Sequence, residues 1–157
     1  MLALAAREEG WQRELFLFDS FQGHPKIASS GAPDGDLVKE FAGTLVASVN
    51  DVQCALKAVD AYDPSRVHII PGWFQDTLRT IPIPAIALLH LDGDWYDSTR
   101  FCLETYYDRV VSSGIIQIDD YYYELMHGCR KATDEFLARR SGYSLSQVEC
   151  ALVIQKD

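Results

Sequence analysis

The chain has 157 residues, of which 48% are apolar and 24% charged, and its formal net charge is −9. This length is typical of one domain with a sizeable core, so we expect a single domain over residues 1–157. The composition excludes a disordered tail, and no apolar run approaches the ~20 residues that cross a bilayer. The negative charge argues against a nucleic-acid backbone as the main partner. We therefore expect neither a membrane nor a nucleic acid as a partner.

Four cysteines are spread along the chain without a C-x-x-C pair or a histidine at zinc-finger spacing. They are Cys54, Cys102, Cys129 and Cys150. Isolated cysteines are usually small buried side chains in a reducing compartment. We therefore expect a cytoplasmic protein without disulfides.

Helices and strands are expected to alternate along the chain. In order, the patterns predict a helix over 2–12, strands at 15–18 and 67–70, a helix starting at 48, a short helix at 76–78, a strand at 86–91, a helix over 98–111, a strand at 115–118, a helix over 127–140, and one or two strands within 145–154. Ser48 and Asp51 have the spacing of a capping box, and Gly114 is expected to end the helix that precedes it. This alternation indicates an α/β fold.

A stretch rich in turn-forming residues separates the first strand from the helix that starts at 48. Residues 22–36 include three glycines and two prolines, so they are expected to form a long loop. A loop of this length in a compact domain is commonly a lid or a binding loop. We expect His24, within it, to lie near the mouth of the site.

Two short apolar runs each end in carboxylates, and this repeated arrangement is the most informative feature of the chain. The runs 86–91 and 115–118 are followed by Asp92, Asp94, Asp119 and Asp120. Such runs are typical of buried parallel strands, whose carboxyl ends form ligand sites. Four carboxylates gathered there repel one another unless a cation lies among them. The sequence therefore predicts a hard-metal site, with Mg²⁺ as the ion.

Asp92, Asp119 and Asp120 are the predicted metal ligands. Three carboxylates would leave positions open for a substrate hydroxyl, whose proton a ligand carboxylate can accept. The alternative is that these residues only cap the helices that follow. Asp94 is expected to support the site or to cap a helix.

Two further segments have the residue types of a nucleotide-like site. Asp19 ends the first strand, where an acidic residue can hold ribose hydroxyls. Gly72, Trp73 and Phe74 form a turn with aromatic faces on which an adenine can stack, although aromatic residues beside turns also belong to cores.

Five segments in order resemble the macrocin O-methyltransferase family of Mg²⁺-dependent and S-adenosylmethionine-dependent sugar O-methyltransferases. The matching segments are Phe18-Asp19-Ser20-Phe21-Gln22-Gly23, Gly72-Trp73-Phe74-Gln75-Asp76-Thr77-Leu78, Leu89-His90-Leu91-Asp92-Gly93-Asp94-Trp95-Tyr96-Asp97-Ser98-Thr99, Gly114-Ile115-Ile116-Gln117-Ile118-Asp119-Asp120-Tyr121 and Gly128-Cys129-Arg130-Lys131-Ala132-Thr133-Asp134-Glu135-Phe136. The resemblance implies a Rossmann-like class I methyltransferase sheet. It also implies that a sugar-like hydroxyl attacks the sulfonium methyl in line.

The resemblance assigns a role to each candidate residue. It implies that Asp92, Asp119 and Asp120 bind the metal and that Asp92 is also the catalytic base. It places Asp19 and Ser20 at the cofactor ribose, and Gly72, Trp73 and Phe74 at the adenine.

One part of the family pattern is not found. Family members carry a first strand and a glycine-rich cofactor loop upstream of the segment around Asp19, whereas this sequence contains no G-x-G. The fold is therefore expected to be N-terminally truncated, without the strand between those ending at Asp19 and at Asp92. The chain would be a fragment, would pair the two flanking strands directly, or would cover the gap as a homo-oligomer. We expect weak cofactor binding.

Two other functions fit parts of the pattern. A truncated chain can be a catalytically silent binding or assembly module. A nucleotide-sugar transferase also uses a D-x-D metal site, but it does not account for Asp119 and Asp120 or for the segment around Asp19. The acceptor cannot be identified, although its specificity would lie partly in residues 22–44.

Overall fold

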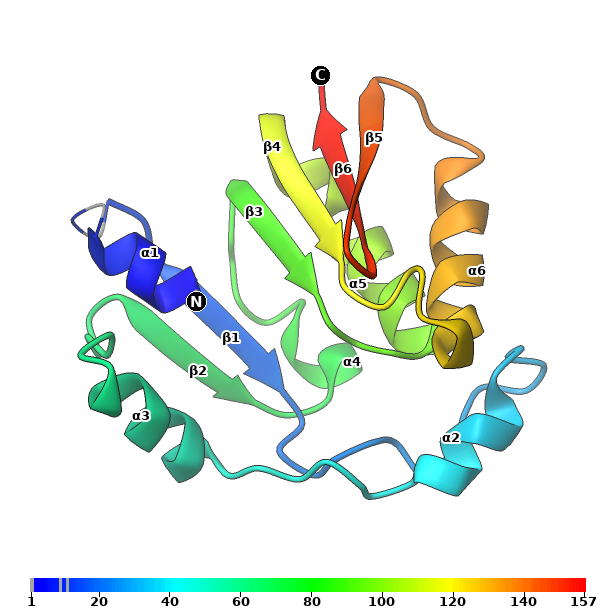
Figure 1. The fold of residues 1–157 in the computed structure, drawn as a ribbon, viewed down its shortest axis with the longest axis horizontal. Helices are drawn as coiled ribbons and strands as arrows, with labels where there is room; N and C mark the ends of the chain where they lie inside the picture. Colours follow the sequence, from blue (N-terminus) through cyan, green and yellow to red (C-terminus); the bar gives the residue numbers. More distant parts are fainter. Residues whose placement is uncertain (1, 9, 11) are drawn as a thin grey trace.

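The computed structural model describes residues 2–8, 10 and 12–157. Helices and strands alternate as expected (Figure 1). In chain order they are α1 (Leu2–Glu8), β1 (Leu15–Asp19), α2 (Gly35–Phe41), α3 (Val49–Ala58), β2 (Val67–Pro71), α4 (Phe74–Thr77), β3 (Ile86–Leu91), α5 (Tyr96–Tyr106), β4 (Val110–Ile118), α6 (His127–Leu137), β5 (Tyr143–Val148) and β6 (Ala151–Lys156), with 3-10 turns at Tyr107–Arg109 and Glu124–Met126. The α/β prediction is confirmed.

The strands form two separate sheets. β1 pairs with β2 in parallel, and the second sheet has the order β3-β4-β6-β5. In that sheet β3 and β4 are parallel, whereas the hairpin of β5 and β6 joins β4 in antiparallel orientation. Figure 1 shows that β1, β2, β3 and β4 all point the same way. Their carboxyl ends therefore lie toward one side of the molecule.

β1 and β3 face each other across the space between the two sheets (Figure 1). Among the described residues, β1 pairs only with β2, and β3 pairs only with β4. In the described part of the chain no strand lies between them. Direct pairing of β1 with β3, one of the three outcomes left open, does not occur among the described residues, and self-association stays a prediction.

The core lies between the four-stranded sheet and the helices α5 and α6, which pack against each other. Its least exposed large side chains are Leu103, Ile116, Ile118 and Ile154. Two of the cysteines, Cys102 and Cys129, are buried as expected, whereas the other two are exposed, and all four are free. None of the helices in the described ranges is both long and apolar enough to cross a membrane.

The start of α3 is as predicted. The Ser48 hydroxyl accepts a hydrogen bond from the Asp51 N–H (3.2 Å), and the Asp51 carboxylate accepts one from the Ser48 N–H (2.8 Å). This reciprocal pair is a capping box, which satisfies N–H groups at the helix start.

The end of α5 differs from the prediction, because Gly114 lies inside β4 instead of ending a helix. The β3–β4 register shifts just before this residue, and Ser113 has a φ of +62°. A Cβ on Gly114 would lie 2.7 Å from the carbonyl oxygen of Val111. Gly114 therefore lies in a β-bulge. The local sequence alone does not distinguish this bulge from the end of a helix.

The long loop is shorter than expected at its far end, because the helix α2 begins at Gly35. The turn-forming residues before it obscured this seven-residue helix. Its one buried side chain, Val38, belongs to the core. Tertiary packing therefore stabilises a helix that has a weak sequence signal.

Candidate functional site

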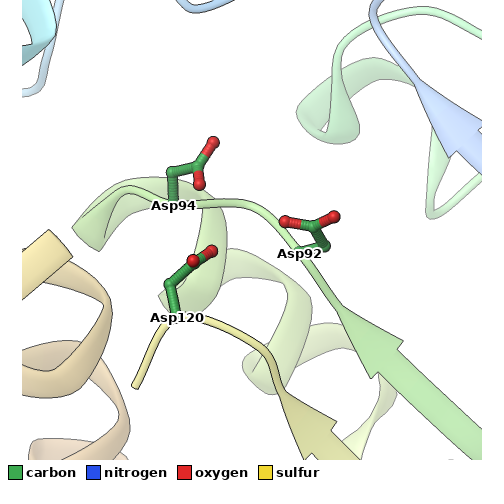
Figure 2. A group of neighbouring side chains, drawn as sticks. All are labelled: Asp92, Asp94 and Asp120. Atoms are coloured by element: carbon green, nitrogen blue, oxygen red, sulfur yellow. The ribbon is translucent and has the colours of Figure 1, made fainter. Parts of the chain in front are cut away.

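Three carboxylates meet beyond the ends of β3 and β4. One oxygen from each of Asp92, Asp94 and Asp120 lies within 4.8 Å of the others (Figure 2), and we call this set the acid cluster. The parallel pairing of β3 with β4 brings the two following loops together. A further hydrogen bond, from the Asp119 N–H to the Leu91 carbonyl (2.9 Å), holds these loops side by side. Carboxylates from two neighbouring strand ends therefore lie within reach of a single ion.

Asp119 lies next to the acid cluster but is not one of its three members. Its Oδ1 accepts a hydrogen bond from the side-chain amide of Gln117 (3.0 Å) and lies 3.2 Å from Nε2 of His90. One carboxylate oxygen is thus engaged by side chains of the two strands. Of the three predicted metal ligands, the structure brings Asp92 and Asp120 together, and Asp94 is the third member. A ligand role for Asp119 stays a prediction.

Burial and mutual repulsion raise the pKa values of the acid cluster. Burial and the charges of Asp94 and Asp119 raise the pKa of Asp120 to about 6. Burial also raises the pKa of Asp92 and of Asp94, and neighbouring carboxylates add to both effects. Each of these groups is therefore less easily ionised than a free aspartate.

The donor set fits a hard divalent cation. Oδ2 of Asp120 is buried and has no hydrogen-bond partner among the described residues. A bound cation would satisfy this oxygen and remove the repulsion among the three carboxylates. Mg²⁺ prefers oxygen ligands of this type.

The predicted ribose-binding residues lie at the end of β1. Oδ1 of Asp19 accepts a hydrogen bond from the Phe21 N–H (2.6 Å), and the Ser20 hydroxyl accepts one from the Gln22 N–H (3.1 Å). Both side chains therefore shape a tight turn at the strand end. The Gly72 N–H donates to the Asp19 carbonyl (2.9 Å), which joins this turn to the end of β2.

The predicted adenine-binding residues form the turn from β2 into α4. Gly72 has a φ of +139°, and a Cβ there would lie 2.7 Å from Cγ2 of Thr77. The Trp73 carbonyl accepts a hydrogen bond from the Thr77 hydroxyl (3.0 Å) at the start of α4. A Cβ built on Gly93 would lie 3.6 Å from the Phe74 ring. Phe74 therefore places this turn beside the loop that carries Asp92 and Asp94.

Two more residues lie beside the acid cluster: His24, which was expected only near the mouth of the site, and Asp34, which the sequence patterns did not single out. Nε2 of His24 lies 3.2 Å from Oδ2 of Asp94, and the buried carboxylate of Asp34 accepts a hydrogen bond from the Tyr96 N–H (2.7 Å). Both belong to the expected long loop. The signal there was only a histidine near the mouth and an aspartate between a proline and a glycine, which is an ordinary turn pattern.

The chain is similar in sequence to known O-methyltransferases. A family model described as Macrocin-O-methyltransferase (TylF) matches residues 1–150. Demethyldecarbamoylnovobiocin O-methyltransferase of Streptomyces niveus is 36% identical over 129 residues, which cover 81% of this chain and 48% of that protein. Mycinamicin III 3''-O-methyltransferase of Micromonospora griseorubida is 35% identical over 131 residues, covering 81% and 50%. The chain spans about half the length of these curated relatives.

Solved structures support the same assignment. The O-methyltransferase NovP has a TM-score of 0.87 and 30% identity, and the match covers 99% of this chain and 65% of that one. The calicheamicin methyltransferase CalS11 has a TM-score of 0.73 and 18% identity, covers 98% and 66%, and bears on the fold alone. The fold is therefore that of a Rossmann-like class I methyltransferase, and the chain belongs to the macrocin O-methyltransferase (TylF) family.

Proposed function

We propose that the chain contains the metal-binding and acceptor-binding part of an S-adenosylmethionine-dependent and Mg²⁺-dependent O-methyltransferase. Its substrate would be a hydroxyl of a sugar or another small molecule. The observation that carries the proposal is the acid cluster beyond the ends of β3 and β4 in a chain of the TylF family. We also propose that the functional form is a homo-oligomer, because β1 and β3 each leave one edge without a partner in the described part of the chain.

Asp92, Asp94 and Asp120 would hold the metal. An ion held there would lower the pKa of an acceptor hydroxyl placed beside it. Asp92 is the proposed base, since its carboxylate lies at the cluster, within reach of a hydroxyl placed beside the ion.

Asp19, Ser20, Gly72, Trp73 and Phe74 are proposed to bind the cofactor. Bound S-adenosylmethionine would supply the methyl group. The residues after β1 and β2 are joined through the Gly72 N–H, and Phe74 lies beside the loop of the acid cluster. The chain would thus hold the methyl group close to the acceptor hydroxyl, and this positioning would supply much of the rate.

A thermal-shift titration of the full chain tests this function. Mg²⁺ together with S-adenosylmethionine or its demethylated product is expected to raise the Tm, because a ligand at a hundredfold excess over its Kd stabilises the folded state by about 2.7 kcal/mol. Sodium chloride at the same ionic strength is the control. The absence of any response would contradict the proposal and favour a silent binding module. Micromolar or tighter cofactor binding would contradict the weak affinity expected without a G-x-G loop.

A pair of substitutions separates the two candidates for the third metal ligand. Asp94→Asn is expected to weaken Mg²⁺ binding more than Asp119→Asn, because Asp94 faces the cluster whereas one oxygen of Asp119 is engaged by Gln117. Titration calorimetry of the two variants measures the difference. A larger loss in Asp119→Asn would restore the ligand set expected from the resemblance.

A further inference from the structure

A hollow of about 240 Å³ lies beside the acid cluster, next to the β5–β6 hairpin. It is lined by Gln117 of β4, by Asp119, Asp120 and Tyr123 of the loop that follows β4, and by residues 148–151 at the turn between β5 and β6. Asp120 belongs both to this hollow and to the acid cluster. The hollow therefore borders the proposed metal site directly.

The hollow and the proposed cofactor-binding turns lie on opposite sides of the acid cluster. The second sheet has the order β3-β4-β6-β5, and β1 and β2 lie on the other side of β3 (Figure 1). The cluster follows β3 and β4, whereas the hollow follows β4 and reaches the start of β6. A methyl group and the oxygen that attacks it in line must approach each other from opposite sides. The hollow thus has the position that an acceptor needs.

Hydrogen bonds hold both parts of the lining in place. The Tyr122 N–H donates to the Cys150 carbonyl (2.9 Å), which joins the loop after β4 to the hairpin turn. Within the turn, the Gln147 side-chain amide donates to the Glu149 carbonyl (2.9 Å). Sites for small molecules are usually largely formed before the ligand binds, and this hollow meets that condition.

The lining combines apolar surface with carboxylates. Tyr123 and Val148 are 46% and 57% exposed, so an aromatic face and an aliphatic side chain are open to a ligand. Asp119 and Glu149 supply carboxylates, which make strong hydrogen bonds to hydroxyl donors. No lysine or arginine of the described residues lines the hollow. A ligand that carries a phosphate or a carboxylate would therefore be repelled.

We propose that the hollow is the acceptor subsite for one neutral sugar ring, and that Tyr123 and the β5–β6 turn determine its specificity. The inference rests on the proposed function, whose acceptor it narrows to a ring without phosphate. The volume is just below the roughly 300–1,000 Å³ of sites for drug-sized ligands, so the hollow takes one ring of a glycoside. One hydroxyl of that ring would reach the acid cluster past Asp120.

Titration of the full chain with simple glycosides, followed by backbone amide NMR in saturating Mg²⁺, tests the subsite. The probes are the methyl glycosides of glucose, galactose, mannose and rhamnose. At least one is expected to shift the signals of Tyr123 and residues 148–151. The methyl glycosides of glucuronic and galacturonic acid should bind several-fold more weakly than their neutral counterparts, because of the added charge. The absence of shifts with every neutral glycoside, or tighter binding of the acids, would overturn the inference.

Val148→Trp is expected to fill the hollow and to abolish the glycoside-induced shifts. Because Val148 is largely exposed, the larger side chain should leave the fold and the Mg²⁺ affinity unchanged. Leu145→Trp is the matched control, because Leu145 lies on the same strand and is 53% exposed but does not line the hollow. Glycoside binding by Val148→Trp that equals that of Leu145→Trp would contradict the proposal.

Tyr123→Ala removes the aromatic face and is expected to weaken glycoside binding by roughly tenfold. Tyr123→Phe keeps that face and should remain within a few-fold of the wild type. With an acceptor found by screening, Tyr123→Ala should raise the acceptor KM and leave kcat nearly unchanged, the pattern for a contact made equally in the ground state and the transition state. An unchanged acceptor KM would show that Tyr123 does not touch the ring.

Failure of the subsite and failure of the proposed function give different results. If the chain binds Mg²⁺ and S-adenosylmethionine but no glycoside shifts the signals of the hollow, only the subsite is wrong. If the chain takes up neither Mg²⁺ nor the cofactor, the proposed function is wrong. The acceptor role of the hollow is then overturned with it, even where a glycoside binds there.

Discussion

Asp92→Asn is expected to lower the rate of methyl transfer by roughly 10²–10⁴-fold, the usual contribution of a positioned general base. Asparagine has nearly the same shape as aspartate but cannot accept a proton at neutral pH. The substitution also removes one of the three carboxylates that lie within 4.8 Å of one another. Both changes act on the acceptor side, so kcat should fall while the affinity for S-adenosylmethionine stays nearly constant.

The measurement is the release of S-adenosylhomocysteine with a glycoside acceptor found by screening, alongside cofactor binding by calorimetry. Asp60→Asn is the matched control, because the Asp60 side chain is 99% exposed and, among the described residues, pairs only with Arg7. Asp60 has a φ of +54°, a conformation that asparagine tolerates well. A kcat of Asp92→Asn within about threefold of the wild type would be far below the loss expected for a base, and Asp92 would then have another role.

The position of the acid cluster was predictable from the sequence. Short apolar runs followed by aspartates indicate parallel strand ends, and neighbouring parallel strands bring those ends together. Asp92 and Asp120 meet for this reason. The third carboxylate was not predictable, because it depends on the backbone conformation and the side-chain hydrogen bonds at each strand end. Asp94 has a φ of +57°, and Asp119 is engaged by Gln117.

Two parts of the fold differ from the prediction for a related reason. Gly114 and the serines before it have the composition of a helix end, but the register shift against β3 places them in a bulge of β4. Residues 22–34 have the composition of an unstructured loop, yet Asp34 is buried at the start of α5. In both cases the deciding contact is with a residue far away in the sequence.

Asp120→Asn is expected to act in opposite directions on metal binding and on stability. Mg²⁺ affinity should fall by more than about 100-fold, because even outer partners of a metal ligand are worth 10–100-fold. The metal-free protein should become more stable at pH 7, because the substitution removes a partly buried charge with two carboxylate neighbours. Solvent screening of the partly exposed group limits the gain in the free energy of unfolding to about 1 kcal/mol, or about 2–4 °C in Tm.

The pH dependence of the stability gain distinguishes the removal of a repelled charge from a general packing effect. The pKa of Asp120 rises from 3.8 to about 6 on folding, so the ionised carboxylate opposes folding, and wild-type stability falls as the pH rises through that interval. In the presence of a chelator, the gain in the free energy of unfolding from Asp120→Asn should therefore be full above pH 6 and disappear near pH 4. Asp60→Asn should show no such change.

Protons and Mg²⁺ compete for the same Asp120 oxygens, so the wild type should lose about tenfold in metal affinity for each pH unit below 6. Calorimetry between pH 5 and pH 7 measures this slope.

A metal-free Asp120→Asn protein that is less stable than the wild type at pH 7 would show that the carboxylates do not repel one another. The argument for a cation among them would then fail.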